Sequence, residues 1–353
     1  MSDQTAIPFL HMRGGTSKGP VFNKKDLPQD QETLGKVLMA AVGSGHQLNI
    51  DGIGAGNSVT TKVPILSKSN DEWADIDYFF VQVQALDKVV DFTTTCGNML
   101  SAVGPAAIEM GLVKAKADET IIKIRAVNTG GRFVSKVKTP NGNLAYTGET
   151  SIDGVPGTAA PVELKFMDIT GSKTGKFLPT GNFKDLIDGI EVTCMDVTMP
   201  VVIGRAADFG ITGYENREKL DLNKPLFARI ESIRLQAAKL MGLGDASGSV
   251  APKFALFAPP KQGGSLCVRY FMPWQTHPTL AVTSSQCLAA CALTVGSVAD
   301  GLVDHLNGNS SDVLFEHPLG FMNVRLDYQS KGVHSVVRSA QIVRTARKLM
   351  DGE

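Results

Sequence analysis

Residues 95–113, with the sequence TCGNMLSAVGPAAIEMGLV, decide the fold, because they predict a helix with apolar or small side chains on nearly every face. Glu109 is its one charged residue, and a helix that is apolar all round is normally buried. A second uncharged helix is expected from about 283 to 295, and Cys287 near its start follows Cys96 by 191 positions. Two buried helices, each inside a mostly β segment, predict a duplicated α+β architecture with a cleft between the halves.

Length and composition limit the class of protein. At about 150 residues per domain, 353 residues predict two domains. The 35 basic residues balance 35 acidic ones, which argues against nucleic acid and anionic membrane surfaces as partners. The least charged window, 275–299, contains too many polar residues for a membrane span, and the first residues lack the pattern of a secretion signal. We therefore expect a cytoplasmic protein with a small-molecule partner.

Cysteine and histidine spacing gives little support for a metal centre. The five cysteines include no CxxC pair, and the six histidines show no HxxxH or HExxH spacing. Free thiols in a reducing compartment fit this pattern best. The sequence therefore predicts no metal.

Periodicity and turn residues place the remaining elements. A helix is expected at 30–43 and a solvent-facing helix at 224–241, each with apolar residues at helical spacing. Alternating apolar runs bounded by turn residues predict strands on both sides of each buried helix. The strands expected in the first half flank a glycine-rich turn at 12–19 and continue at 59–67, 76–86, 88–93, 121–127, 132–138 and 144–152, and those of the second half lie at 190–203 and 264–272.

Cys96 is the sharpest local signal, because Cys96-Gly97-Asn98 places a thiol at the N-terminus of the first buried helix. The unpaired backbone N–H groups and the positive end of the helix dipole favour anions there. Such a position lowers the pKa of a thiol, and it binds a carboxylate equally well. The structural alternative is a small buried cysteine at a turn.

Lys62 follows the glycine-rich segment 51–57, at the start of a predicted strand. A lysine that points into a cleft could act as a base if desolvation or neighbouring cations lowered its pKa, whereas most lysines at strand starts are solvated. The glycines do not form a dinucleotide-binding motif, because residues 59–64 read as β and contain a proline. Residues 13–19 lack the P-loop order but could present Arg13, Thr16 and Ser17 to an anion, with an ordinary tight turn as the alternative.

The second buried helix has its own candidate groups. His277 precedes it and is the histidine expected to face a cleft, while the other five are expected to be structural. Cys287 near its start could face Cys96 if the halves are duplicated, and Cys291 one turn later is expected in the core.

Six sequence blocks in order resemble the PrpF-like family of 2-methylaconitate cis-trans isomerases, and within it the 4-oxalomesaconate tautomerase and Δ-isomerase branch. The similarity runs from end to end. The blocks are MRGGTSKG (12–19), DGIGAGNSVTTKV (51–63), TCGNMLSAVGPAAIEMGLV (95–113), DGVPGTAAPV (153–162), RIESIRLQAAKLMGLGDAS (229–247) and RTARKLMDGE (344–353).

This resemblance implies the diaminopimelate epimerase-like fold, an α+β fold in which two pseudo-symmetric domains each wrap strands around a central helix. It implies an N-terminal domain of residues 1–188 plus 327–353, which carries the active-site lysine and cysteine, and a C-terminal domain of residues 189–326. The family's catalytic lysine and cysteine match Lys62 and Cys96. The substrate-binding residues that we expect with them are Arg13, Gly15, Thr16, Ser17, Thr61, Gly97, Asn98, His277, Ser284 and Ser285.

The resemblance further implies an isomerase that needs no cofactor and that moves a proton and a double bond in a small unsaturated tricarboxylate. Lys62 is the expected base of a dienolate mechanism, with Cys96 as acid or supporting donor. Near the second helix many relatives have Thr-Gly-Ala, whereas this chain has Thr-Ser-Ser-Gln-Cys at 283–287, so Cys287 is a possible second thiol. A homodimer is also a possible state.

Three other functions stay open at this point. One is cis-trans isomerisation of 2-methylaconitate or aconitate. Another is an amino-acid epimerase that uses Cys96 and Cys287 as opposed acid and base. The last is a carboxylate-binding protein without turnover.

Overall fold

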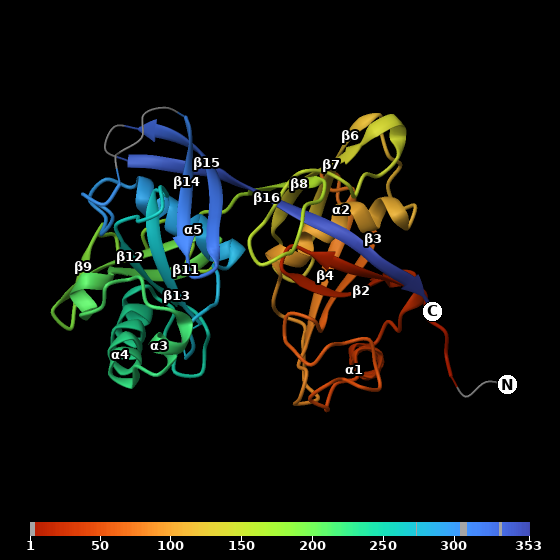
Figure 1. Ribbon diagram of the computed structural model, residues 1–353, viewed down its shortest axis with the longest axis horizontal. Helices are drawn as coiled ribbons and strands as arrows, with labels where there is room; N and C mark the ends of the chain where they lie inside the picture. The colour runs from red at the N-terminus through yellow and green to blue at the C-terminus, as the bar shows by residue number, and fades with distance from the viewer. Residues whose placement is uncertain (1–3, 273, 304–308, 332–333) are drawn as a thin grey trace. The chain divides into compact units, whose positions relative to one another are not determined.

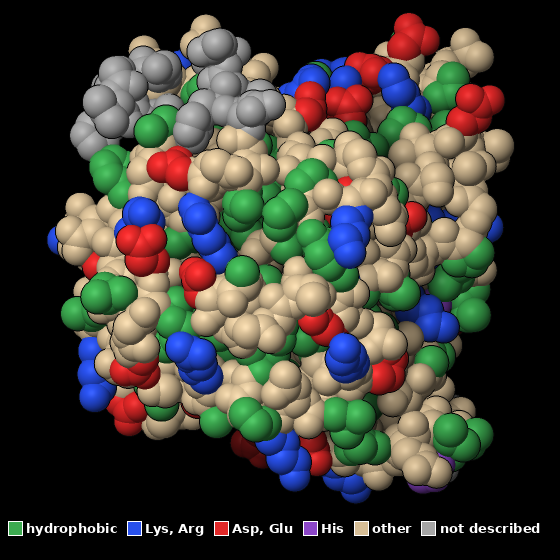
Figure 2. All heavy atoms as spheres, turned by 60° about the vertical axis from the view of Figure 1, so that its left-hand side comes forward, with side chains coloured by type: hydrophobic (Ala, Val, Ile, Leu, Met, Phe, Trp, Pro, Cys, Tyr) green, Lys and Arg blue, Asp and Glu red, His purple; other side chains and the backbone are tan. Residues whose placement is uncertain are grey.

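The computed structural model describes residues 4–272, 274–303, 309–331 and 334–353, which form two compact units (Figure 1). Unit 1 comprises Met1–Met167 and Val343–Glu353, and unit 2 comprises Asp168–Ile342. No helix in the described ranges combines the length and the apolar character that crossing a bilayer requires. On the face drawn in Figure 2, Lys and Arg side chains are interspersed with Asp and Glu, in line with the balanced composition.

In unit 1, strands surround helix α2 (Gly97–Glu109), and residues 99–107 of this helix are all buried (Figure 1). The predicted buried helix is therefore confirmed. Last in the chain, β16 (His334–Gly352) lies next to both β1 and β8, so the strand order closes on itself. The order is β1 (Phe9–Gly14), β2 (Ser17–Asn23), β3 (Lys62–Lys68), β4 (Ile76–Val83), β6 (Asp118–Ala126), β7 (Arg132–Thr139) and β8 (Pro161–Met167), with β5 (Val90–Asp91) paired to β4.

Small residues let these strands approach α2 closely. A Cβ at Gly14 on β1 would lie 2.7 Å from the carbonyl oxygen of Asn98, and one at Gly104 would lie 2.7 Å from Ser135 Oγ on β7. Larger side chains at either glycine would push strand and helix apart. The two glycines thus allow the short distance between α2 and the strands that pack on it.

Helix α1 (Gln31–Val42) packs its apolar side against the same sheet and confirms the helix predicted at 30–43. Asp30 caps its N-terminus by accepting a hydrogen bond from Thr33 N at 2.8 Å, and Gly43 ends it in the left-handed region at φ 72°. Single 3-10 turns lie at Lys24–Asp26, Pro140–Gly142 and Ala206–Phe209.

Unit 2 repeats the scheme around helix α5 (Val282–Leu293), whose residues 284–292 are all buried. This helix packs on β10, β11 and β15. The second predicted buried helix is thereby confirmed. The strand order is β9 (Asp185–Ile187), β10 (Ile190–Val197), β11 (Met199–Arg205), β12 (Lys253–Ala258), β13 (Leu266–Phe271), β14 (Ser310–His317) and β15 (Gly320–Lys331), followed by β16.

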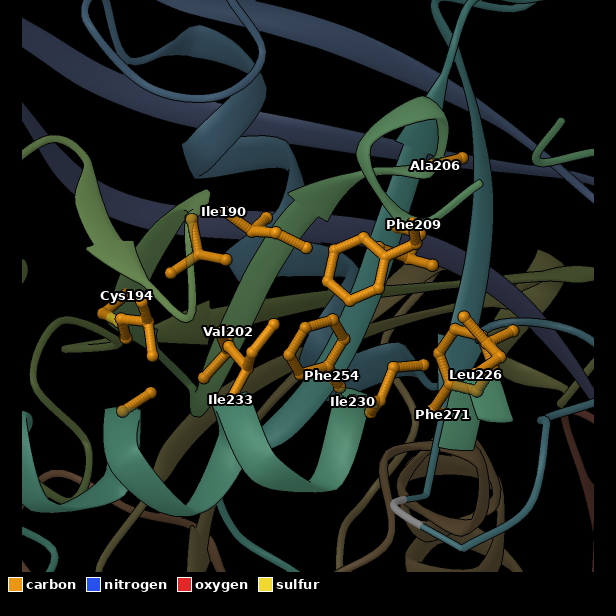
Figure 3. Close-up of a cluster of buried hydrophobic side chains, with 14 of the residues drawn as sticks. Ile190, Cys194, Val202, Ala206, Phe209, Leu226, Ile230, Ile233, Phe254 and Phe271 are labelled. Carbon is orange, nitrogen blue, oxygen red and sulfur yellow. The ribbon is translucent and has the colours of Figure 1, made fainter. Parts of the chain in front are cut away.

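The other face of this sheet is covered by α4 (Lys224–Leu240), which follows the short helix α3 (Arg217–Asp221). Figure 3 shows Leu226, Ile230 and Ile233 pointing from α4 toward strand side chains that include Phe254. This apolar face repeats at helical spacing, as the sequence predicted for residues 224–241.

Several sequence predictions differ from the structure. The single strand expected at 190–203 is divided into β10 and β11 by a turn at Thr198, whose φ is 64°. The strand predicted at 144–152 is wrong, because this segment forms a loop with a single bridge between Thr150 and Ala159, and the next strand is β8. A Cβ at Gly148 would lie 2.7 Å from the Cα of Ala160, so the loop folds back tightly on the segment that precedes β8.

The compact units also end at other positions than the boundaries after 188 and before 327 that the sequence suggested. Residues 168–187 belong to unit 2, where the buried Asp196 carboxylate accepts hydrogen bonds from Ser172, Lys173 and Thr174. The pairing of β15 with the first part of β16 extends unit 2 to Ile342.

Candidate active site

Lys62 begins β3 in unit 1 and lies opposite Gln82 of β4. Its half-buried side chain donates a hydrogen bond from Nζ to Gln82 Oε1 at 2.6 Å, and Nζ lies 5.5 Å from the centroid of the Phe80 ring. The amine is thus oriented by an amide oxygen and an aromatic face, which adds no negative charge beside it.

The Gln82 amide is itself fixed by backbone acceptors. Its Nε2 donates to the carbonyl oxygens of Val83 at 3.0 Å and Ser58 at 3.2 Å, so its oxygen is left to face Lys62. Thr61 is fully buried, and its hydroxyl donates to the Val83 carbonyl at 2.6 Å. The sequence prediction placed Thr61 at the substrate, but in the structure its hydroxyl supports the strand that carries Lys62.

Cys96 caps the N-terminus of α2, where its sulfur accepts a hydrogen bond from Met99 N at 3.5 Å. The side chain is half-buried, and the Cys96 carbonyl oxygen accepts a hydrogen bond from the Tyr78 hydroxyl at 3.2 Å. Burial raises the pKa of Tyr78 well above its usual value, and the electrostatic interaction with Cys96 acts in the same direction. Tyr78 therefore stays a neutral donor beside the thiol.

Lys62 and Cys96 lie on the same face of β4. Tyr78, Phe80 and Gln82 alternate along this strand, so their side chains point to one side. The Tyr78 and Phe80 rings have centroids 6.2 Å apart and connect the residue that contacts Cys96 to the one that contacts Lys62. The structure thus brings the Lys62 amine and the Cys96 main chain to neighbouring aromatic side chains of β4 in unit 1.

The glycine-rich turn between β1 and β2 packs on the first turn of α2. Asn98 Nδ2 donates to Thr16 Oγ1 at 3.1 Å, and a Cβ at Gly15, whose φ is 53°, would overlap Asn98 Oδ1. That oxygen is buried and has no hydrogen-bond partner among the described residues. Ser17 is buried at the start of β2, and Gly97 is the first residue of α2. The predicted Gly15, Thr16 and Asn98 are therefore neighbours.

Arg13 supplies a positive charge at the same turn. Its Nη1 donates to the carbonyl oxygens of Gly15 at 2.9 Å and Thr345 at 3.0 Å. Arg347 lies directly opposite on β16, and burial together with this second guanidinium lowers the pKa of Arg13. Two like charges that face each other across strands are destabilising, so a bound anion would relieve this repulsion.

In unit 2, His277 and Ser284 meet at Tyr270. The Tyr270 hydroxyl and Ser284 Oγ are hydrogen-bonded at 2.6 Å, and the Tyr270 and His277 rings have centroids 5.8 Å apart. His277 Nδ1 accepts a hydrogen bond from Thr279 N at 3.0 Å, and burial lowers the pKa of His277 to about 4. The imidazole is therefore neutral at pH 7. Ser285 Oγ donates a hydrogen bond to the Val282 carbonyl oxygen at 2.8 Å.

Cys287 is fully buried within unit 2, where its sulfur donates to the Met195 carbonyl oxygen at 3.5 Å. Burial raises its pKa well above the usual value for a thiol. A thiol in this environment stays protonated and packs as a small apolar group.

Comparison with known proteins identifies the family. A model of the family described as PrpF protein matches residues 4–353. The chain belongs to the PrpF family. A (4E)-oxalomesaconate Delta-isomerase of Novosphingobium sp. is 45% identical over 347 residues, which are 98% of this chain and 96% of that protein. A 4-oxalomesaconate tautomerase of Pseudomonas putida is 43% identical over 349 residues, covering 99% of this chain and 96% of its own.

Solved structures agree with this assignment. The crystal structure of a methylitaconate-delta-isomerase superposes on the PrpF-family chain with a TM-score of 0.87 at 33% identity, covering 99% of this chain and 95% of the other. A hydroxyproline epimerase from Agrobacterium vitis, at 13% identity and a TM-score of 0.55, shares the fold; the two cover 99% and 93% of their chains. This PrpF-family protein is an isomerase with the diaminopimelate epimerase-like α+β fold.

Sequence reasoning did not identify Tyr78, Phe80, Gln82 or Tyr270 as part of the site. A signal for Gln82 exists in IDYFFVQV, because a glutamine occupies an inward position of an otherwise apolar alternation. Tyr270 had no such signal, since a tyrosine in a core strand is ordinary. Within the described residues of the PrpF-family isomerase, no three His, Cys, Asp or Glu side chains are grouped so that they could hold a metal ion.

Proposed function

We propose that this isomerase shifts a proton and a double bond in a small unsaturated tricarboxylate, with 4-oxalomesaconate as the first candidate. The proposal is supported mainly by the contacts of Lys62 with Phe80 and of the Cys96 carbonyl with Tyr78, two neighbouring rings of β4, and by the position of Cys96 at the N-terminus of α2. The two oxalomesaconate-directed relatives, at 45% and 43% identity, support the substrate.

Lys62 acts as the base in this mechanism. Its neutral amine takes a proton from a carbon next to a carboxylate or keto group, and the C–H electron pair enters the conjugated system as a dienolate. Return of a proton to the other end of the allylic unit completes the isomerisation, so no oxidation or reduction occurs. The backbone N–H groups at the start of α2 and the charge of Arg13 stabilise the developing negative charge.

Two versions of the second step differ in the role of Cys96. In the two-base version the Cys96 thiol donates the proton to the allylic carbon and is reprotonated by the Lys62 ammonium. In the one-base version Lys62 returns the proton itself, and Cys96 supports the dienolate as a hydrogen-bond donor. The half-buried position of Cys96 fits either role.

The first prediction separates these versions. Lys62→Ala should lower kcat on 4-oxalomesaconate by about 10²- to 10⁴-fold in either case, because the base is lost. Cys96→Ser should cost a comparable factor in the two-base version and less than about tenfold in the one-base version. Lys68→Ala, at the exposed end of the same strand, is the matched control.

The assay follows isomerisation and deuterium uptake in deuterated water with 4-oxalomesaconate, 2-methylaconitate and aconitate. Turnover of 2-methylaconitate or aconitate alone would reassign the substrate to the cis-trans reaction. Binding of all three without isomerisation or deuterium uptake would refute the proposal in favour of a carboxylate-binding protein. An amino-acid epimerase that uses Cys287 has no support from the buried environment of this thiol.

A further inference from the structure

Arg344 is a buried cation that the proposed reaction does not use. Only 6% of its surface is exposed, and its Nη1 donates to the Val343 carbonyl oxygen at 3.1 Å. Its Nε is buried and has no hydrogen-bond acceptor in the described part of the chain. Desolvation lowers the pKa of Arg344 to about 10, so the guanidinium still carries its charge at pH 7.

The register of β16 places Arg344 at the N-terminal end of α2. Lys348 on this strand binds Glu109, the last residue of α2, with Nζ and Oε2 3.0 Å apart. Ala346 is buried opposite Gly14, whose Cβ position lies next to Asn98 and Met99. Residues 344, 346 and 348 point to the same face of β16, the face that packs on α2. Lys348 lies at the C-terminal end of α2 and Ala346 near its first turn, so the same direction along the strand leads to Arg344 at the N-terminal end.

Neighbouring contacts confirm this placement. The carbonyl oxygen of Thr345 accepts hydrogen bonds from Gly15 N at 2.9 Å and from Ser101 Oγ, in the first turns of α2, at 3.4 Å. The buried, unpartnered Asn98 Oδ1 belongs to the same region. A buried guanidinium whose Nε has no acceptor among the described residues and the first turn of α2 therefore adjoin the turn that carries Thr16.

Asp153 is the acidic residue that interacts with the Arg344 guanidinium. It interacts electrostatically with Arg344 and opposes the effect of burial on the guanidinium. The adjoining Gly154 has a φ of 86°, and a Cβ there would lie 3.1 Å from Thr16 Cγ2, so the loop that carries Asp153 packs on the glycine-rich turn. A mobile carboxylate of the substrate can satisfy the same cation.

We propose that Arg344 binds one carboxylate of the substrate at the first turn of α2 and that Asp153 competes for the same guanidinium. This inference rests on the proposed function, because it assumes a polycarboxylate ligand. It assigns Arg344 as a specificity residue in addition to Arg13. A buried guanidinium selects a carboxylate strongly, since a ligand without that group leaves the cation unpaired.

The test measures binding without turnover, by calorimetric titration with tricarballylate, a saturated tricarboxylate that cannot isomerise. Arg344→Gln should weaken binding by about 10- to 100-fold, as expected for a lost charge-assisted hydrogen bond. Asp153→Asn should strengthen it, because the competing charge is removed while Arg344 stays. Arg338→Gln, an exposed arginine on the same strand, is the control and should leave affinity unchanged.

Two further variants guard against misfolding. Arg344→Lys keeps the buried charge and should retain part of the affinity, and added guanidinium ion should restore binding to Arg344→Ala. Unchanged affinity in folded Arg344→Gln, or weaker binding in Asp153→Asn, would overturn the inference. If the wild-type protein binds tricarballylate through Arg344 but isomerises no tricarboxylate, the inference stands and the proposed function fails.

Discussion

At the scale of single residues, the unusual feature is that a neutral amide orients the candidate base. Gln82 accepts the Lys62 hydrogen bond and is held by two backbone carbonyls, so Lys62 has a fixed position without a carboxylate partner. A carboxylate there would favour the ammonium form and thereby oppose its use as a base. The choice of an amide is consistent with the proposed chemistry.

Gln82→Glu tests this idea. The new carboxylate should form an ion pair with Lys62 and make the amine less available as a base, so kcat on 4-oxalomesaconate should fall by about tenfold or more. The control is Gln84→Glu, just beyond the end of β4, because among the described residues the hydrogen bond of Lys62 Nζ goes to Gln82. A kcat equal to that of the wild type in folded Gln82→Glu would contradict the role of Lys62 as the base.

At the scale of elements, the position of Lys62 depends on the close approach of β2 and β3. A Cβ at Gly19 would overlap the carbonyl oxygen of Lys62, and Lys18 N donates to the Val59 carbonyl oxygen at 2.9 Å. These contacts fix the position of the Lys62 backbone at the start of β3. The sequence placed Gly19 in a turn, but its role is to admit a neighbouring strand.

Gly19→Ala should therefore destabilise unit 1 and displace Lys62. We expect a loss of about 3 kcal/mol in the free energy of unfolding, at the upper end for an overpacked site, together with a fall in kcat. Urea denaturation and steady-state kinetics measure the two effects. Gly248→Ala, where a Cβ meets no atom within 4 Å, should change neither. Wild-type stability in Gly19→Ala would contradict the close approach.

The two central helices differ in how they begin, although both are buried. Cys96 caps α2 with its sulfur, whereas Ala281 precedes α5 and offers no side-chain cap. The sequence predicted both helices from their lack of charge, because burial alone imposes that composition. The sequence also placed Cys96 at the start of the first helix, but it did not predict that the second helix begins without a side-chain cap.

On the scale of the whole molecule, each unit contains a histidine whose pKa is low, the buried His11 in unit 1 and the half-buried His277 in unit 2. Burial lowers the pKa of His11 in unit 1 and of His277 in unit 2 to about 4, from 6.5. Between pH 6.5 and about 4 the unfolded chain binds protons that the folded chain does not. The stability that the neutral histidines contribute is thus present above pH 6.5 and is lost as the pH falls toward 4.

Urea denaturation at pH 7.5 and pH 5 measures this loss. His277→Gln and His11→Gln should each reduce the pH dependence of the free energy of unfolding by up to about 2 kcal/mol, because both histidines have a pKa of about 4 in the folded chain. His46→Gln, on an exposed loop, serves as control. An equal difference between pH 5 and pH 7.5 in wild type and His277→Gln would show that His277 titrates freely.

Local patterns were enough for several parts of the molecule. The uncharged stretches at 95–113 and 283–295 predicted two buried helices, and the Cys96-Gly97-Asn98 triplet predicted a thiol at a helix start. These predictions succeeded because each depends on short-range periodicity and capping. The strand predicted at 144–152 was wrong because this segment contacts residues 159–160 and forms a loop.

The sequence by itself determined three features of this protein: a lysine after a glycine-rich turn, a thiol before a buried helix, and equal numbers of acidic and basic residues. Only the tertiary structure decided their partners. Gln82 beside Lys62, Tyr78 beside Cys96 and Arg347 opposite Arg13 all come from pairings between segments distant in sequence. Strand register and burial create such pairings, and neither is written in the local pattern of any one segment.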